Sequence, residues 1–227
     1  MKKKHNLIEL FLVLMLLAAI APTYADDNGQ PKIHGKTYGE WSAKWWQWLR
    51  SIPAQSNPLL GSGQVDCSIE QSGPVVFLAG TTGGDPVVRE CSVPKGKELF
   101  FSPLNAMYYN DPADPLPHPN VAEKRIALDG FLSSACNLNI TVDGEKLLFS
   151  AVAIARTQSP TFRINIGDDD VFGGTAGAID NKVVSDGFWV MLRMPKGTHT
   201  LHVQGAACDP PGMPFFEQDY KYILHVE

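Results

Sequence analysis

The sequence predicts a mainly β protein, a β-sandwich or jelly roll with a tryptophan-rich amphipathic helix near the N-terminus and a second short helix. Two observations support this fold class. Short stretches rich in β-branched and aromatic residues alternate with glycine and proline turns, and only two stretches have helical spacing. The part of the chain that follows the N-terminal apolar run is long enough for one core, so we expect residues 37–227 to form a single β-sandwich domain.

The N-terminus has the pattern of a secretory signal peptide. Three lysines at positions 2–4 precede an apolar run of about 12 residues, shorter than the roughly 20 that a membrane-spanning helix needs. Residues 23–25 end the run with the small residues of a cleavage site. We therefore expect residues 1–25 to be removed, leaving no stable membrane span, and residues 26–36 to be mobile. A retained membrane anchor is the alternative.

The negative net charge and the predicted export of the chain limit the partners that it can bind once residues 1–25 are removed. Without residues 1–25 the chain loses three of 19 basic and one of 24 acidic residues, which leaves a formal charge of −7. Nucleic acids and anionic lipid surfaces select clustered positive charge, so we expect no nucleic-acid partner. The leader predicts a secreted or periplasmic protein of a bacterial cell.

The stretch YGEWSAKWWQWLRSIP, from Tyr38 to Pro53, predicts the first helix. Thr37 and Glu40 fit a capping box at its start, and Pro53 ends it near Ser51. One arc of about 100° holds the side chains that we expect to be buried: Tyr38, Trp41, Trp45, Trp48, Leu49 and Ile52. The opposite face holds Glu40, Lys44, Gln47, Arg50 and Ser51. Trp46 lies outside the buried arc, which makes it the candidate for stacking on a sugar or a partner.

The remaining elements follow in order along the chain. The run 75–79 is apolar at every position, as expected for a strand covered on both faces. A second helix is expected from about Val121 to Ala135, after a capping pattern at Asn120 and Glu123. Asp143-Gly144 predicts a hairpin turn. Further strands are expected over residues 87–93, 97–101, 161–166, 187–194, 198–203 and 219–226.

Four cysteines, an even number in an exported chain, predict two disulfides. Three pairings are open. We favour Cys67–Cys91 and Cys136–Cys208, because the first pair brackets a hairpin-like stretch. No two cysteines have the close spacing of a zinc site.

Several segments together resemble a family of uncharacterised secreted bacterial proteins. They are YGEWSAKWWQWLRSIP, GPVVFLAGTTGG with the following cysteine and VPKGKELFF, TVDG, SPTFRINIGDDDVFG and SDGFWVMLRMPKGTHTLHV. The resemblance spans most of the mature chain and implies secretion and a β-rich domain. It supplies no catalytic residues.

Two loops carry candidate sites. Asp168, Asp169 and Asp170, with Asp180 nearby, offer oxygen ligands for calcium, although the segment fails the EF-hand pattern at two positions. A solvated acidic loop is the alternative. The other loop, NDPADPLPHPN, places Asp111, Asp114 and His118 together as candidate ligand-binding residues.

Signatures of a nucleophile elbow, a zinc protease, a P-loop and a dinucleotide fold are missing from the sequence. The favoured hypothesis is a noncatalytic binding protein for a glycan or an envelope component, with calcium as a cofactor of its acidic loop. A secreted hydrolase that uses acidic loop residues is the first rival, because distant carboxylates can meet in space. A structural envelope protein is the second.

Overall fold

A computed structural model describes residues 24–25, 31–116, 118–147 and 155–227, and the chain divides into two compact units, Met1–Thr37 and Tyr38–Glu227. In the first unit, β1 (Tyr24–Ala25) pairs antiparallel with β2 (Pro31–Lys32). Two backbone hydrogen bonds between Ile33 and Lys36 close a turn after β2. The remainder of the predicted signal peptide, and residues 26–30 of the predicted mobile segment, lie outside the described residues.

The second unit is mainly β, with two sheets and two helices, as the sequence predicts. The helices are α1 (Tyr38–Ser51) and α2 (Val121–Ser133), and a 3-10 turn, η1 (Ala54–Ser56), follows α1. The five-stranded sheet contains β4 (Val75–Phe77), β6 (Glu98–Tyr108), β9 (Ala155–Gln158), β10 (Phe162–Asn165) and β11 (Ile179–Arg193). The six-stranded sheet contains β3 (Gly63–Gln64), β5 (Val87–Val93), β7 (Ala135–Val142), β8 (Glu145–Lys146), β12 (Gly197–Cys208) and β13 (Pro214–Val226).

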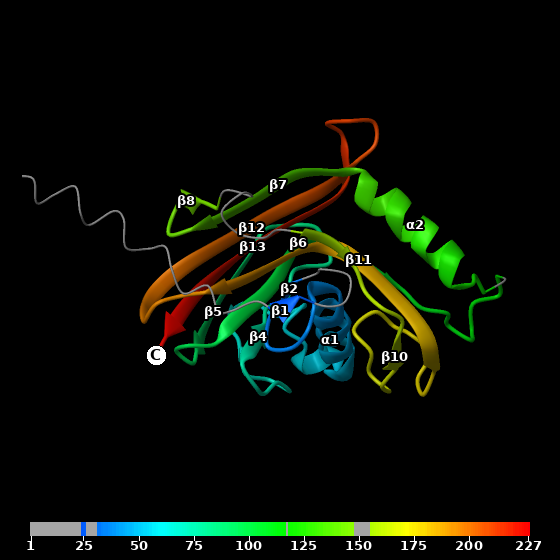
Figure 1. The fold of residues 1–227 in the computed structure, drawn as a ribbon, viewed down its shortest axis with the longest axis horizontal. Helices are drawn as coiled ribbons and strands as arrows, with labels where there is room; N and C mark the ends of the chain where they lie inside the picture. Colours follow the sequence, from blue (N-terminus) through cyan, green and yellow to red (C-terminus); the bar gives the residue numbers. More distant parts are fainter. Residues whose placement is uncertain (1–23, 26–30, 117, 148–154) are drawn as a thin grey trace, which may run out of the picture. The chain divides into compact units, whose positions relative to one another are not determined.

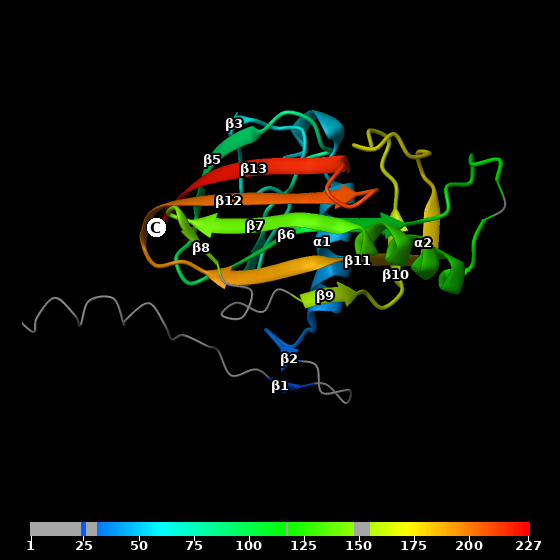
Figure 2. The same ribbon diagram turned by 90° about the horizontal axis from the view of Figure 1, so that it is seen from above.

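The two sheets pack face to face and α1 covers the outer face of the five-stranded sheet. The five-stranded sheet has the order β10-β11-β6-β4, with β9 also beside β11, and the six-stranded sheet has the order β3-β5-β13-β12-β7-β8. Figure 1 shows these layers in sequence, with β12 and β13 above, β6 and β11 across the middle and α1 below. Figure 2 shows the six-stranded sheet from above. The architecture is therefore a β-sandwich with a helix added on one side.

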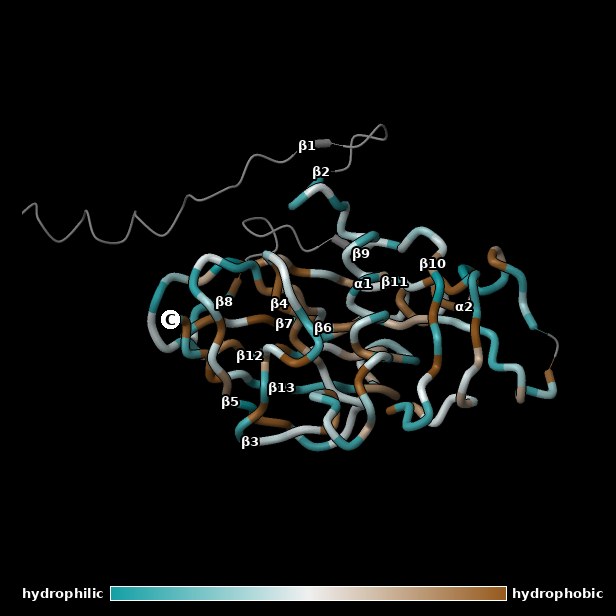
Figure 3. Tube along the Cα trace, turned by 90° about the horizontal axis from the view of Figure 1, so that it is seen from below, coloured by the Kyte–Doolittle hydropathy of each residue, from teal (hydrophilic) through white to brown (hydrophobic). Residues whose placement is uncertain are grey.

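Alternation along β6 explains how one strand serves both layers. Leu99 and Phe101 belong to the core between the sheets, together with residues of β12 and β13. Phe100 points the other way, because successive side chains of a strand face opposite sides. Its ring stacks on Trp189 at 4.8 Å between centroids and meets Tyr38 of α1 edge-on. Figure 3 shows hydrophobic and hydrophilic colours interleaved along the trace, as expected for strands whose successive side chains face opposite sides.

The tryptophans of α1 lie mainly in the core, as predicted. All six residues of the predicted arc are buried, with Trp45 2% and Leu49 0% exposed. A buried indole N–H needs an acceptor. Nε1 of Trp45 donates to the Leu78 carbonyl at 3.0 Å, and Nε1 of Trp48 donates to the Ile69 carbonyl at 2.9 Å. The helix is thus fixed by both apolar packing and directed hydrogen bonds.

Both favoured disulfides form, Cys67–Cys91 and Cys136–Cys208. The reason given for the first was wrong, because the stretch between its cysteines is not a hairpin. β4 pairs parallel with β6 in one sheet, while β5 pairs parallel with β13 in the other. The fully apolar β4 is buried at every position and lies at the edge of the sheet that α1 covers. It therefore could not share a hairpin with the half-exposed β5.

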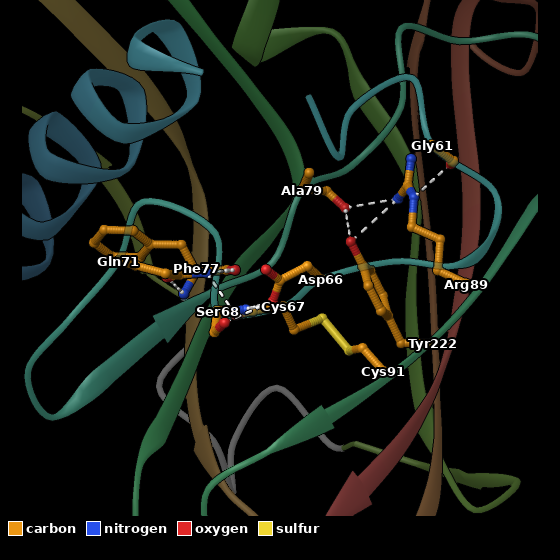
Figure 4. Close-up of a disulfide and its surroundings, with 10 residues drawn as sticks. All are labelled: Gly61, Asp66, Cys67, Ser68, Gln71, Phe77, Ala79, Arg89, Cys91 and Tyr222. Atoms are coloured by element: carbon orange, nitrogen blue, oxygen red, sulfur yellow. Dashed lines mark hydrogen bonds between the residues drawn. A yellow bond between two sulfur atoms is a disulfide. The ribbon is translucent and has the colours of Figure 1, made fainter. Parts of the chain in front are cut away.

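The buried side chain of Arg89 in β5 hydrogen-bonds to the loop that contains Leu59 and Gly61. Its hydrogen-bond partners among the described residues are carbonyl and hydroxyl oxygens, with no carboxylate among them. The side chain is 0% exposed, and it donates to the carbonyls of Leu59, Gly61 and Ala79 at 2.9–3.0 Å. Tyr222, 3.3 Å from Nη1, donates its hydroxyl to the same Ala79 carbonyl (Figure 4). The planar fork of arginine suits this arrangement, since it offers several donors in fixed directions.

Two local predictions for α2 and the following hairpin are confirmed. Asn120 and Glu123 form the predicted capping box. Asp143 and Gly144 have φ values of 53° and 85°, the left-handed angles that their hairpin turn requires. No helix in the described part of the chain is both long enough and apolar enough to cross a membrane.

Candidate functional site

A cavity opens where β6 extends beyond its short neighbour. β4 pairs with Glu98–Phe100 of β6, and the next part of β6 continues past the end of β4. The cavity, called the α1 pocket below, has a volume of about 480 Å³. Its walls come from α1, from β6 and the residue after it, from three loops, from α2 and from β13. In that order the lining residues are Trp45, Trp46, Leu49, Arg50, Asn105, Ala106, Met107, Tyr109, Leu59, Gly80, Thr81, Thr82, Phe172, Phe131, Phe216 and Gln218.

Trp46 lies in the wall of this pocket and is buried, so the expectation of an exposed ring was wrong. Its exposure is 7%, because Phe172 from the loop 166–178 lies against it, with the ring centroids 6.1 Å apart. Trp45 meets it edge-on from the other side at 5.0 Å. Nε1 of Trp46 is buried and hydrogen-bonds to none of the described residues.

Arg50 lies one helical turn after Trp46 and lines the same pocket. The sequence places it on the polar face, but its side chain is 3% exposed and its Nε lies 2.7 Å from Oδ1 of Asp170. The guanidinium lies over the rings of Tyr109 and Phe172, at 4.8 and 5.1 Å. Its Nη2 is a second buried donor that meets no acceptor among the described residues with full hydrogen-bond geometry, although the guanidinium interacts with the Tyr109 hydroxyl. A long loop therefore folds over the helix and buries this cation.

Most other polar groups of the lining are already hydrogen-bonded inside the protein. Gln218 accepts from the N–H of Thr81 and donates to the carbonyls of Ser102 and Pro103. The hydroxyl of Thr81 accepts from the N–H of Gly83 at 3.2 Å. The hydroxyl of Tyr109 donates to Asp111 at 2.9 Å, and burial raises its pKa. The fully buried polar atoms left over in the lining residues, Trp46 Nε1 and Arg50 Nη2, are both donors. The half-buried amide of Asn105 and the exposed hydroxyl of Thr82, which can both donate and accept, also belong to the lining.

Asp111 joins the two loops that the sequence singled out. Its carboxylate accepts from the backbone N–H of Thr175 at 2.8 Å and from the Thr175 hydroxyl. The N–H of Ala113 donates to it as well, at 2.9 Å. These hydrogen bonds hold the pKa of Asp111 well below its ordinary value. Asp111 does not line the pocket; it holds the loop that covers Trp46.

The structure does not gather the other two candidate ligand-binding residues at the pocket. Asp114 accepts a hydrogen bond from the N–H of Leu116 at 2.9 Å, which makes it part of a turn. His118 is exposed. Neither residue is in the lining of the α1 pocket.

Three of the four carboxylates considered for calcium have different partners, and the fourth, Asp168, is exposed. Asp170 pairs with Arg50, and Asp180 pairs with the buried amine of Lys124 at 2.6 Å. Asp169 accepts from the N–H of Gln55, while Asp168 is exposed. Among the described residues, no group of three or more histidine, cysteine, aspartate or glutamate side chains has the geometry to hold a metal ion. The calcium hypothesis gains no support from this arrangement.

Sequence reasoning missed Arg50, Tyr109 and Phe172 as site residues. A signal for Arg50 was present, since it follows Trp46 by four residues and so lies on the same helix face. Nothing local marks Phe172, whose contact with Trp46 joins residues far apart in the chain.

Comparison of the chain with protein-family models, with curated proteins and with solved structures found no match.

Proposed function

We propose that this chain is a noncatalytic binding protein that works outside the cytoplasm, secreted or periplasmic, and that its ligand occupies the α1 pocket. The observation that carries the proposal is a cavity of about 480 Å³ with aromatic walls and two buried donors, Trp46 Nε1 and Arg50 Nη2, without partners among the described residues. Ligand pockets have this size and composition, apolar and aromatic with a few polar groups that set orientation.

The unpartnered donors favour a ligand over an empty cavity. Leaving a buried donor without an acceptor costs about 1–3 kcal/mol, so proteins seldom retain one without a reason. A ligand acceptor at Trp46 would remove that cost. The signal-like N-terminus and the two disulfides support the compartment, because disulfides form and persist in oxidising environments.

A glycan or another envelope component remains within the proposal as a class of ligand. Sugar rings stack on aromatic side chains, and the pocket supplies several. The carboxylates that a hydrolase would need are otherwise engaged, since Asp111 accepts from Thr175 and Tyr109 and Asp170 pairs with Arg50. We therefore do not propose a catalytic role for these two residues.

Thermal unfolding with a ligand panel tests the proposal. The panel holds aliphatic and aromatic acids and their esters, oligosaccharides and short peptides. A ligand that binds the folded state raises the unfolding midpoint by an amount that grows with the ratio of its free concentration to its Kd. Met107→Trp places a large ring in the pocket and should abolish the shift, whereas Val88→Trp, at an exposed position outside the pocket, should preserve it. A shift of equal size in both variants would place the ligand elsewhere and refute the proposal.

A further inference from the structure

We infer that the ligand of the α1 pocket is an apolar chain that ends in a hydrogen-bond acceptor, a carboxylate or an ester carbonyl. This inference rests on the proposed function and narrows it. It follows from two features of the pocket, the kind of polar group left unpartnered and the apolar surface that continues from its rim.

The fully buried donors among the lining residues favour a ligand that carries a hydrogen-bond acceptor. Trp46 and Arg50 lie one turn apart on α1, and Phe172 contacts both. Asp170 already balances the charge of Arg50, so the site accepts a neutral carbonyl as well as a carboxylate. Both atoms left over, Trp46 Nε1 and Arg50 Nη2, are donors.

A ligand that must donate many hydrogen bonds fits this wall poorly. The amide of Gln218 and the hydroxyl of Thr81 are engaged with backbone groups, and the hydroxyl of Tyr109 is engaged with Asp111. The side-chain acceptors that the lining still offers are the amide oxygen of Asn105 and the exposed hydroxyl of Thr82. Each hydroxyl of a sugar both donates and accepts, and burying one without an acceptor is unfavourable. The wall therefore favours a ligand with a single acceptor group over a glycan.

The apolar part of the ligand has a continuous surface to follow. Inside the pocket lie Trp45, Leu49 and Leu59, each buried. At the rim, Phe131 contacts Phe215, with ring centroids 6.1 Å apart.

The surface continues outside the pocket along the turn between β12 and β13. Phe215 is 59% exposed and Met213, two residues before it, is 62% exposed. An exposed apolar surface that borders a pocket is typical of a binding site. A ligand with an extended apolar chain can contact both the cavity and this outer surface. A compact aromatic acid is too short to contact both.

Isothermal titration calorimetry of the purified full-length protein tests the inference. The probes are decanoate, methyl decanoate, decylammonium, phenylacetate and a chitin tetrasaccharide, with each amphiphile kept below its micelle concentration. Decanoate and its methyl ester should bind, and decylammonium, whose head group only donates, should bind at least 10-fold more weakly. Phenylacetate should also bind at least 10-fold more weakly than decanoate.

Trp46→Phe keeps an aromatic ring at this position but removes the indole N–H together with the five-membered ring, so it should weaken decanoate binding about 3- to 10-fold. Trp48→Phe is the matched control, because Trp48 donates to Ile69 outside the pocket, and it should leave the affinity for decanoate unchanged. Equal weakening by both variants would assign the effect to a loosened helix and overturn the role of Trp46.

The remaining outcomes separate this inference from the proposed function. If phenylacetate bound as tightly as decanoate, the inference that the ligand is an extended chain would be overturned. Binding of the tetrasaccharide, lost in Met107→Trp, with no binding of decanoate, would overturn the inference and leave the proposed function standing. No heat from any probe, with no probe shifting the unfolding midpoint, would overturn both.

Discussion

The ring of Phe172 covers the ring of Trp46, with 6.1 Å between their centroids, although 126 positions separate them in the chain. Phe172 itself is 44% exposed. A half-exposed side chain thus covers a buried indole in the wall of a pocket.

Replacing Phe172 by alanine should expose Trp46 and cost little stability. The loss should be about 1–2 kcal/mol, less than for a fully buried phenylalanine. Acrylamide quenching of tryptophan fluorescence should increase in Phe172→Ala, and the increase should vanish when Trp46→Phe is added. An unchanged quenching constant in the single variant would show that Phe172 does not cover the indole in solution.

The ion pair between Lys124 and Asp180 should make stability depend on pH. Burial alone would raise the pKa of Asp180, but hydrogen bonds from Lys124, Asn110 and Lys182 outweigh it and lower the pKa below its ordinary value. A carboxyl with a lowered pKa stabilises the fold above its ordinary value near pH 4, and the contribution is lost as the pH falls through the lowered pKa.

Asp180→Asn leaves the amine of Lys124 buried without its counter-ion, so it should cost about 3–5 kcal/mol at pH 7. Urea unfolding at pH 7 and at decreasing pH should show the difference from wild type shrinking below about pH 4. Asp114→Asn is the control, since asparagine can keep the turn at this exposed position. A pH-independent difference would refute the electrostatic origin.

Arg89 should matter for the shape of the pocket as well as for stability. Arg89→Leu leaves the carbonyls of Leu59 and Ala79 without this donor, and each lost partner costs about 1–3 kcal/mol. Hydrogen exchange should rise in residues 57–61, which include the pocket residue Leu59. The exposed Arg163→Leu should leave the exchange of that loop unchanged, and equal exchange in both variants would contradict the role of Arg89.

The outer apolar surface should matter for long ligands alone. Phe215→Ser removes an exposed ring beside Phe131, outside the pocket lining. Calorimetry should show the variant binding tetradecanoate at least 3-fold more weakly than wild type does, with the same affinity for octanoate. A loss of the same size for both chain lengths would mean that the chain does not extend over this surface.

The fold could be predicted from the sequence where the signals are local. The tryptophan spacing gave the buried arc of α1, and Asp143-Gly144 gave the hairpin turn. β6 and β11 extend well beyond their predicted lengths, because pairing between distant strands decides where they end: β6 pairs with β11, and the first residues of β11 pair with β10. β9 was missed, since its strand character comes from pairing with β11.

The site could be predicted only in part, because it is built from distant segments. Trp46 was singled out from its helix position, but its burial depends on Phe172, which no local pattern links to it. Arg50 was assigned to the polar face because the helical spacing places it opposite the buried arc, and the contact with Asp170 that accompanies its burial joins two distant parts of the chain. Asp111 was singled out as a ligand-binding residue, but its partners give it a structural role, and it is not in the lining of the pocket.

The most direct test of the account is the indole N–H resonance of Trp46, followed by nitrogen-15 NMR during titration with decanoate. We predict a saturable shift of that resonance, with the indole resonances of Trp45 and Trp48 nearly still because their N–H groups already donate to Leu78 and Ile69. A Trp46 resonance that stays fixed at saturating decanoate and with every other probe of the panel would contradict the account.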